Sequence, residues 1–327
     1  MPDVITFGEA MIRLSPPNFR RLEQARSLDV QVGGAELNTA VAMARLGRST
    51  SWVSRLTLNP LGRLIANHAR EAGVGTEHIV WAEGDRVGLY FLEFGAAPRA
   101  SSVLYDRKGA AIAGIRPGMI AWSTVFAGAR WFHVTGITPA LSASAAETTR
   151  EALQAARAAG IKTSIDLNYR AKLWSQAEAG KWMTEFMPLC DVLITTEEDT
   201  VRVFGITGKN YEDIAAQCAR RFPVQVVAIT LRENPLVWKN SWTAIAYGDG
   251  KTYRTRSYDV EIVDRLGAGD SFAAGLIDGL LDDDVQRGLD YGVAASALKH
   301  SIPGDFAWIT RDEVEALLKS GELRISR

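Results

Sequence analysis

The sequence predicts an α/β fold with a mostly parallel central sheet, and two observations lead to this prediction. After Arg130, short apolar runs alternate with longer helical segments, and the runs cover residues 131–135, 162–166, 191–195 and 224–230. This alternation is typical of a parallel sheet with helices on both faces. The 327 residues are 47% hydrophobic and 23% charged, which allows a sizeable buried core. With no clear linker, we expect one domain over residues 1–327.

Composition narrows the classes of partner. The formal net charge is −1, with 37 Lys and Arg against 38 Asp and Glu, so no basic footprint for nucleic acid is evident. No apolar stretch is long enough for a membrane span, and the first residues do not resemble a signal peptide. Cys190 and Cys218 lack metal-ligand spacing and are interpreted as buried free thiols. We therefore expect a cytoplasmic protein that binds neither membrane nor nucleic acid.

The N-terminal part is expected to contribute strands, helices and a small separate β layer. Residues 3–7 are typical of a buried strand, and 12–32 of loops with one strand off the main sheet. Gly33 and Gly34 precede a helix that Gly47 ends. The remaining elements are a strand at 50–53, a helix at 60–73, and two extended runs at 87–94 and 102–108 that form a hairpin or edge strands.

The C-terminal part continues with further helices and a hairpin. We expect helices over 144–160 and up to Pro188, then from Glu197 and on to Phe222. A hairpin surrounds Gly248–Gly250, and 258–263 is extended. Helices at 270–281, 284–300 and 310–319 follow.

Residues 264–272 read Asp-Arg-Leu-Gly-Ala-Gly-Asp-Ser-Phe, a glycine turn that leads directly into a helix. The first N–H groups of a helix lack internal partners, and together with the helix dipole they attract anions. We call residues 267–269 the anion turn. Asp270 follows it, where a hydroxyl that attacks a bound phosphate could reach the carboxylate. This arrangement suits phosphoryl transfer, while the alternative is that Asp270 only caps the helix.

The topology predicts where the other polar residues meet. Ligands of parallel α/β sheets lie beyond the carboxyl ends of the strands. Gly136, Asn168–Arg170, Thr195–Glu198 and the loop after Thr230 all follow predicted strands, so we expect them on the same rim as the anion turn.

Several residues outside this rim allow both a binding and a structural interpretation. Gly33 and Gly34 permit close backbone approach to a polar ligand that Asn38 would bind, or they only form a tight entry turn. Alternation places Tyr105 and Arg107 on one face of their strand, with Tyr90 in the preceding run. An ordinary surface strand is the alternative for these three.

On these motifs the chain resembles the ribokinase-like (PfkB) carbohydrate kinases over essentially its whole length. Gly33-Gly34 with Asn38 looks like the family's sugar-binding signature, and 264–270 like its C-terminal signature. Residues 166–170, 172–174, 105–107 and 303–306 look most like the members that phosphorylate 2-keto-3-deoxygluconate. The resemblance implies a three-layer α/β sandwich with a small β lid, formed here by 12–34 and 86–112. It also implies ATP as donor and Mg²⁺ as cofactor.

The resemblance assigns roles to individual residues. Asp270 would be the catalytic base, and Gly267, Ala268 and Gly269 would stabilise the transferred phosphoryl group. ATP would contact Thr230, Arg232, Gly267 and Gly269, and Glu198 would act indirectly on the metal. The substrate would be held by Gly33, Gly34, Asn38, Tyr90, Tyr105, Arg107, Asn168 and Arg170.

The chain departs from the family pattern at three places. Thr195 stands where the family has an Asn of the magnesium-water network. Arg265 and Leu266 replace threonines, and residues 231–241 replace a glycine-rich nucleotide loop. Adenine contacts in that loop are therefore not assigned.

The expected function is ATP-dependent phosphorylation of a hydroxyl of a small sugar acid, foremost 2-keto-3-deoxygluconate to its 6-phosphate. Arginine forks match carboxylates, so Arg107 and Arg170 favour a sugar acid unless they pair with protein carboxylates such as Asp106 or Asp166. Alternatives are a kinase for a neutral sugar (fructose or ribose) or nucleoside, and a non-catalytic sugar-binding protein. We also expect a homo-oligomer, with the lid as its contact.

Overall fold

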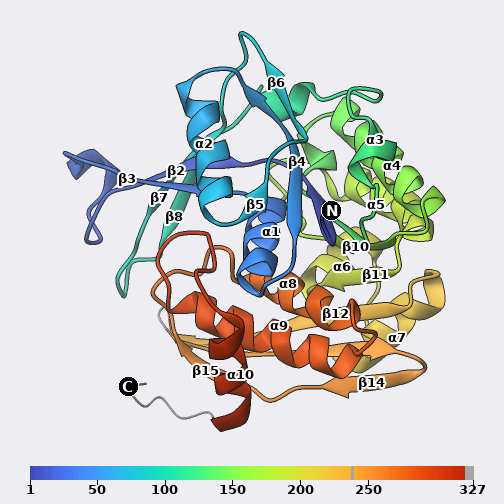
Figure 1. The fold of residues 1–327 in the computed structure, drawn as a ribbon. Helices are drawn as coiled ribbons and strands as arrows, with labels where there is room; N and C mark the ends of the chain where they lie inside the picture. Colours follow the sequence, from blue (N-terminus) through green and yellow to red (C-terminus); the bar gives the residue numbers. More distant parts are fainter. Residues whose placement is uncertain (237–238, 321–327) are drawn as a thin grey trace.

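The computed structural model describes residues 1–236 and 239–320, and for residues 232–236, 239–240 and 320 it describes the backbone alone. Its main feature is a large, mostly parallel sheet in the order β14-β13-β12-β11-β10-β9-β1-β4-β5, to which β15 and β6 add at β13 and β4 (Figure 1). The strands are β1 (Val4–Phe7), β4 (Thr50–Thr57), β5 (Val74–Gly75), β6 (Ile79–Ala82), β9 (Trp131–Thr135), β10 (Lys162–Asp166), β11 (Val192–Thr195), β12 (Val226–Leu236), β13 (Lys239–Gly248), β14 (Lys251–Arg254) and β15 (Tyr258–Glu261).

The parallel part of this sheet is buried on both faces. Along β1, Ile5 and Phe7 join one hydrophobic cluster while Val4 joins another on the opposite face. Along β9, Phe132 and Trp131 divide between the two clusters in the same way. Strands buried on both faces contain continuous apolar runs, which is why the sequence pattern predicted them. The predicted α/β class is confirmed.

Helices cover both faces of the sheet. Residues of α3 to α7 complete the first cluster, and residues of α1, α8, α9 and α10 the second. The helices are α1 (Ala35–Arg45), α2 (Pro60–Glu71), α3 (Trp122–Val125), α4 (Ala143–Ala158), α5 (Gln176–Phe186), α6 (Glu197–Phe204), α7 (Tyr211–Arg221), α8 (Ala268–Leu280), α9 (Val285–His300) and α10 (Arg311–Ser320). Short 3₁₀ helices lie at Leu22–Gln24, Ala111–Gly114, Pro139–Leu141 and Met187–Leu189. No helix in the described ranges is long and apolar enough to cross a bilayer.

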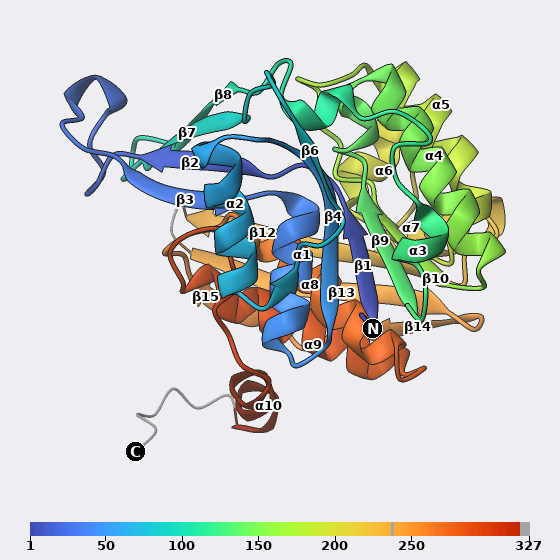
Figure 2. The ribbon, with the colours of Figure 1, turned by 45° about the horizontal axis from the view of Figure 1, so that its top comes forward.

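A second, four-stranded sheet projects from the body in the order β3-β2-β7-β8 (Figure 2). Its strands are β2 (Met11–Ser15), β3 (Asp29–Gly33), β7 (Leu89–Glu93) and β8 (Ser102–Asp106). The segment 12–32 was expected to hold one strand, and this was wrong because β2 and β3 pair with each other. The edge strand β3 is half exposed and polar, so it lacks an apolar run. We call this layer the second sheet, and its action as a lid stays a prediction.

The expected loop over 231–241 was also wrong. β12 continues to Leu236 and pairs antiparallel with β13, with a register shift between Glu233 and Leu236. Pro235 lies within this irregular stretch. A proline cannot donate to a β ladder, so it is tolerated only where regular pairing is interrupted. The proline that indicated a loop in the sequence therefore lies at a register shift in the pairing of β12 with β13.

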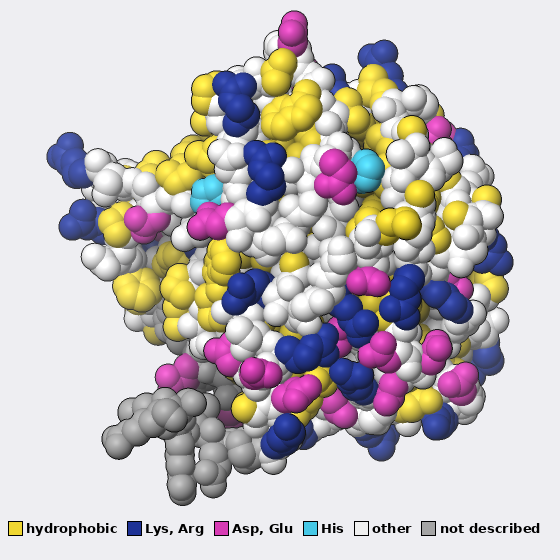
Figure 3. Space-filling view, viewed as in Figure 1, with side chains coloured by type: hydrophobic (Ala, Val, Ile, Leu, Met, Phe, Trp, Pro, Cys, Tyr) yellow, Lys and Arg dark blue, Asp and Glu magenta, His cyan; other side chains and the backbone are white. Residues whose placement is uncertain are grey.

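Helix α8 is held closely against α9. A methyl group on Gly275 would lie 2.5 Å from the backbone nitrogen of Gly292, and one on Gly279 would lie 2.2 Å from that of Gly288. The far end of α8 is tied by buried Asp278, whose Oδ1 accepts hydrogen bonds from Arg48 Nε at 2.6 Å and Arg311 Nη2 at 2.7 Å. On the face drawn in Figure 3, side chains of both charges are interspersed.

We predict that Asp278→Asn lowers the free energy of unfolding by about 1–3 kcal/mol, because two arginines lose a buried anionic partner. Activity should stay within twofold of wild type, since Asp278 lies about two helical turns from Asp270. Urea unfolding measures the first effect. The matched control is Asp282→Asn, an exposed partner of Arg48, which should change stability by less than about 1 kcal/mol. Equal effects of the two variants would contradict the prediction.

Candidate active site

A cavity of about 420 Å³ lies between the carboxyl ends of the parallel strands and the second sheet. All but one of the residues assigned from the sequence line it. They are Gly33, Gly34, Asn38, Tyr90, Tyr105, Arg107, Asn168, Arg170, Glu198, Thr230, Gly267, Ala268, Gly269 and Asp270. The exception is Arg232, whose side chain lies outside the described residues.

The anion turn opens α8 at one side of the cavity. Gly267 is the N-cap with φ 80°, a left-handed conformation that favours glycine. A methyl group on Gly267 would lie 2.0 Å from the backbone oxygen of Asp305, so only glycine fits here. A methyl group on Gly269 would meet no atom within 4 Å. The turn lines the cavity at the N-terminus of α8, which is where helices attract anions.

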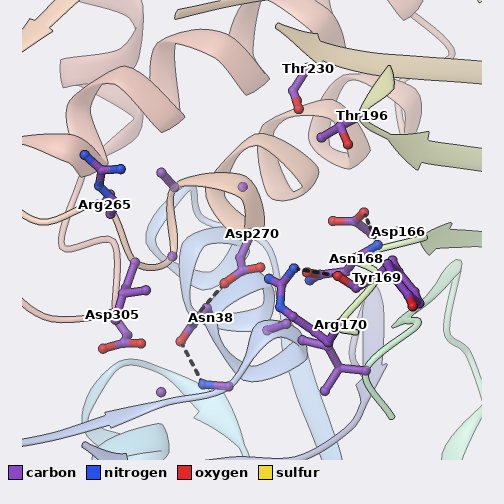
Figure 4. A pocket seen from close by; sticks show the side chains of 18 of the residues that line it. Asn38, Asp166, Asn168, Tyr169, Arg170, Thr196, Thr230, Arg265, Asp270 and Asp305 are labelled. Carbon is purple, nitrogen blue, oxygen red and sulfur yellow. Dashed lines mark hydrogen bonds between the residues drawn. The ribbon is translucent and has the colours of Figure 1, made fainter. Parts of the chain in front are cut away.

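Asp270 is the third residue of α8, so it is not the N-cap of the helix. Its Oδ2 accepts a hydrogen bond from Asn38 Nδ2 at 2.7 Å, and Gly34 N donates to Asn38 Oδ1 at 3.3 Å (Figure 4). Burial raises the pKa of Asp270 to about 6, against the lowering effects of the Asn38 hydrogen bond and of Arg170. A carboxylate with this pKa is ionised at neutral pH and is a stronger base than an ordinary aspartate.

Arg170 comes from the loop after β10 and lies among acidic residues that line the cavity. Figure 4 shows its guanidinium group pointing toward Asp270. Its positive charge lowers the pKa values of Asp166, Asp199 and Asp270. Burial nevertheless raises the pKa of Asp166 to about 8, with the charges of Asp199 and Asp270 adding to the effect. Arg170 Nη1 donates a hydrogen bond to the backbone oxygen of Tyr169 at 3.2 Å.

Arg107 follows β8 and reaches the cavity from the second sheet. Its Nη2 donates to Oε2 of Glu9, which follows β1 and is buried. The alternative of pairing with a protein carboxylate thus applies to Arg107, with Glu9 as partner, whereas Asp106 pairs with Arg86 at 2.7 Å. Among the described residues, Glu9 Oε1 and Arg107 Nε are buried without a hydrogen-bond partner. Arg107 therefore keeps one N–H group, and Glu9 one oxygen, that the pair itself does not satisfy.

A buried network joins the second sheet to the anion turn. Arg13 of β2 forms ion pairs with Asp264 at 2.6 Å and Asp305 at 2.8 Å. The Asp264 carboxylate also accepts hydrogen bonds from Leu266 N at 3.1 Å and Gly304 N at 3.0 Å. The Tyr90 hydroxyl donates to Asp305 Oδ2 at 2.5 Å. Asp264 thus joins the segment before the anion turn to the segment at 304–305, which packs against Gly267.

Sequence reasoning did not assign a site role to Glu9, Arg13, Asp166, Asp199 or Asp305. Glu9 and Asp166 stand at the ends of β1 and β10, so the rim rule that placed Asn168 applied to them as well. Asp199 lies within the first turn of α6, at the same rim. Arg13 gave no local signal, because its partners are more than 250 positions away in the chain.

The cavity lining also includes Thr195 of β11, Glu198 and Asp199 of α6, and Thr230 of β12. Thr195 Oγ1 donates to the backbone oxygen of Thr196 at 3.0 Å, and Glu198 pairs with Arg202 at 2.5 Å. Within the ranges that the structure describes, no group of three or more His, Cys, Asp or Glu side chains could hold a metal ion. Mg²⁺ in kinases needs only one or two carboxylates besides phosphate and water, so Glu198 and Asp199 fit a nucleotide-bound ion.

Comparison with known proteins gives consistent results. The pfkB carbohydrate kinase family matches residues 1–305. The chain is 40% identical to 2-dehydro-3-deoxygalactonokinase of Haloferax volcanii over 99% of both chains, and 31% identical to 5-dehydro-2-deoxygluconokinase of Shouchella clausii over 97% of this chain and 95% of that one.

Solved structures agree with this relationship. The crystal structure of 2-dehydro-3-deoxygluconokinase from Thermotoga maritima has a TM-score of 0.92 at 44% identity, over 96% of this chain and 97% of that one. A putative ribokinase II from E. coli in complex with ATP and Mg²⁺ shares the fold, with a TM-score of 0.85 at 21% identity over 98% of this chain and 99% of that one. The chain therefore belongs to the pfkB family of carbohydrate kinases.

Proposed function

We propose that this protein transfers the γ-phosphoryl group of ATP to a hydroxyl of a small sugar acid, foremost 2-keto-3-deoxygluconate to its 6-phosphate. One observation carries the proposal: Arg107 of the second sheet and Arg170 of the main rim line the cavity that contains Asp270 and the anion turn. A guanidinium fork recognises a carboxylate bidentately. The names of the relatives from Haloferax volcanii and Thermotoga maritima, which both denote sugar-acid kinases, support this choice.

The substrate would lie between the second sheet and α1. The side chain of Asn38 would bind its hydroxyl groups, and Gly33, Gly34, Tyr90, Tyr105 and Asn168 line the same space. A side chain at Gly34 would collide with the backbone oxygen of Glu9 at 1.9 Å, so the chain passes here only as glycine. The side chain of Asn38 links the backbone of Gly34 to the carboxylate of Asp270, because it accepts a hydrogen bond from Gly34 N and donates one to Asp270.

Asp270 would accept the proton of the attacking hydroxyl. As the new O–P bond forms and the bond between the γ-phosphorus and the bridging oxygen breaks, ADP leaves and the hydroxyl proton passes to the carboxylate. The N–H groups of the anion turn would stabilise the charge that develops on the phosphoryl oxygens. Because the transition state is loose, the proton can leave late, and a base with a pKa of about 6 is sufficient.

ATP would extend from the anion turn toward Thr230, Glu198 and Asp199, which line the same cavity. Mg²⁺, when bound, would neutralise charge on the phosphates, and Glu198 and Asp199 are the residues that would hold it through water. The predicted ATP contact of Arg232 stays a prediction.

The second sheet would act as a lid that excludes water during transfer. Exposed apolar side chains on it, Val30, Leu104 and Tyr105, agree with the expected homo-oligomer through this sheet. A cytoplasmic location likewise stays a prediction.

The direct test of the proposed function is a coupled ADP assay with ATP, magnesium and a panel of 2-keto-3-deoxygluconate, 2-keto-3-deoxygalactonate, fructose, ribose and a nucleoside. We expect the highest kcat/KM with a 2-keto-3-deoxy sugar acid. A preference for fructose, ribose or the nucleoside would contradict the sugar-acid assignment and leave the kinase assignment in place. No turnover of any compound would favour a non-catalytic sugar-binding protein.

We predict that Asp270→Asn lowers kcat by roughly 10²–10⁴-fold, because the amide cannot accept the hydroxyl proton. Substrate affinity, measured by calorimetry, should stay within a few-fold since the shape of the side chain is kept. Exposed Asp282→Asn serves as the control and should retain full activity. Turnover of the Asp270 variant within threefold of wild type would reduce Asp270 to a structural residue.

The pH profile gives a second prediction. The base acts when ionised, so kcat/KM should fall as pH drops through the pKa of Asp270, about 6, and level off above it. Arg170 lowers this pKa, and Arg170→Ala should therefore move the acid limb to higher pH. Arg220→Ala, which changes an exposed arginine of α7, should leave the limb in place. A limb near pH 4 in the wild type would contradict the assignment.

The two arginines provide a third prediction. Arg107→Ala or Arg170→Ala should raise KM for the sugar acid by roughly 10–150-fold, the effect of losing a charged hydrogen bond of about 1.5–3 kcal/mol. KM for any neutral sugar should change far less. Arg86→Ala removes an arginine that precedes β7, pairs with Asp106 of β8 and does not line the cavity, so the KM of this variant should stay within twofold. Equal losses with acidic and neutral substrates would contradict carboxylate recognition.

A further inference from the structure

Lys299 lies near the end of α9 and is fully buried. It has no role in the proposed function. Lysine is almost never fully buried unless its ammonium group is paired. Its Nζ donates to the backbone oxygen of Ile302 at 2.9 Å and lies 3.5 Å from that of Asp264. The carbonyl of Asp264 belongs to the segment before the anion turn, and that of Ile302 to the segment that follows α9. We call these two the segments flanking the anion turn.

The side chain runs directly beneath the anion turn. A methyl group on Gly267 would lie 3.4 Å from Cε of Lys299, which is ordinary van der Waals contact. The charge of Lys299 also lowers the pKa of Asp270. The ammonium group is thus close enough to influence the reacting carboxylate electrostatically, although it does not line the cavity.

The charges around Lys299 balance only when its own charge is counted. Asp264 and Asp305 are buried carboxylates, and Arg13 forms ion pairs with both. With Lys299 the group holds two negative and two positive charges. Burial lowers the pKa of Lys299, whereas the carboxylates of Asp264, Asp305 and Asp270 raise it. Without its charge, a net negative charge would lie beneath a turn that must accept the charge of a phosphoryl group.

We propose that Lys299 is a positioning residue for phosphoryl transfer, whose ammonium group joins the segments flanking the anion turn and keeps the electrostatic potential there positive. This inference rests on the proposed kinase reaction. A fixed charge supplied by the fold needs no reorganisation during the reaction, which is how preorganised groups stabilise developing charge. Since the ammonium group acts through the turn, its effect should be smaller than that of a direct donor.

The first test compares Lys299→Met with wild type. Methionine is unbranched and of similar length, and it removes only the charge and its hydrogen bonds. We expect kcat to fall about tenfold or more, below the roughly 10²–10³-fold typical of a direct donor. KM for the carbohydrate should stay within threefold. Lys162→Met, at the start of β10, is the matched control and should keep full activity. A kcat of Lys299→Met within threefold of wild type would overturn the proposal.

The second test separates charge from volume. Lys299→Ala leaves a space that propylammonium fills with its charge and 1-propanol fills without it, at equal ionic strength. We expect propylammonium to restore kcat at least fivefold and 1-propanol to have no effect. Equal effects of the two compounds, including none from either, would overturn the assignment of the charge.

Thermal unfolding of each variant shows whether it folds. If Met and Ala variants do not fold, Lys299→Gln keeps a donor for the Ile302 carbonyl and loses the charge, and the same tenfold criterion for kcat applies to it. All ratios use whichever carbohydrate the wild type phosphorylates best. An incorrect substrate assignment therefore leaves this test intact, and a wild type without turnover refutes the proposed function instead.

Discussion

The buried ion pairs of Arg13 are the interaction on which the geometry of the site depends. This residue of the second sheet bonds two carboxylates whose segments shape the anion turn on the main body. Breaking such a buried pair by removing one partner costs about 3–5 kcal/mol, because the remaining charge is uncompensated. The second sheet therefore has a defined position relative to α8. In the proposed reaction, this network would set the distance between a substrate held by that sheet and the phosphoryl group.

Local pattern predicted most of the fold and much of the site. Continuous apolar runs identified the parallel strands, and the rule for strand ends brought Asn168, Arg170 and Glu198 to one cavity with Asp270. Interactions between distant segments were not predictable in this way. The pairs of Arg13, and of Arg107 with Glu9, form only when the second sheet docks. At Pro235, local preference indicated a loop, whereas pairing with β13 kept the segment in the sheet.

The same two effects, burial and the charge of Arg170, act on the pKa values of three acidic residues in the cavity. Asp166, Asp199 and Asp270 all have raised pKa values, because they are buried. Arg170 offsets this effect at each of them. A cavity of this kind is poorly suited to a bare triphosphate, since like charges repel strongly at low dielectric. The cavity becomes suitable once cations accompany the phosphates. This agrees with the proposal that the nucleotide binds together with Mg²⁺ near Asp199 and Glu198.

The pair between Arg107 and Glu9 bears on how an acidic sugar would be distinguished from a neutral one. Glu9 compensates the guanidinium charge in the ligand-free protein, while Arg107 Nε and Glu9 Oε1 keep hydrogen-bonding capacity. In the proposed complex, a substrate carboxylate would bind the guanidinium group of Arg107 beside Glu9 and replace part of its lost hydration. A neutral sugar in the same place supplies weaker acceptors to a buried cation, and charge-assisted hydrogen bonds are roughly twice as strong as neutral ones. On this proposal, discrimination would arise from the hydrogen bonds that Glu9 leaves unmade, because an arginine fully satisfied by protein would offer a sugar acid no advantage.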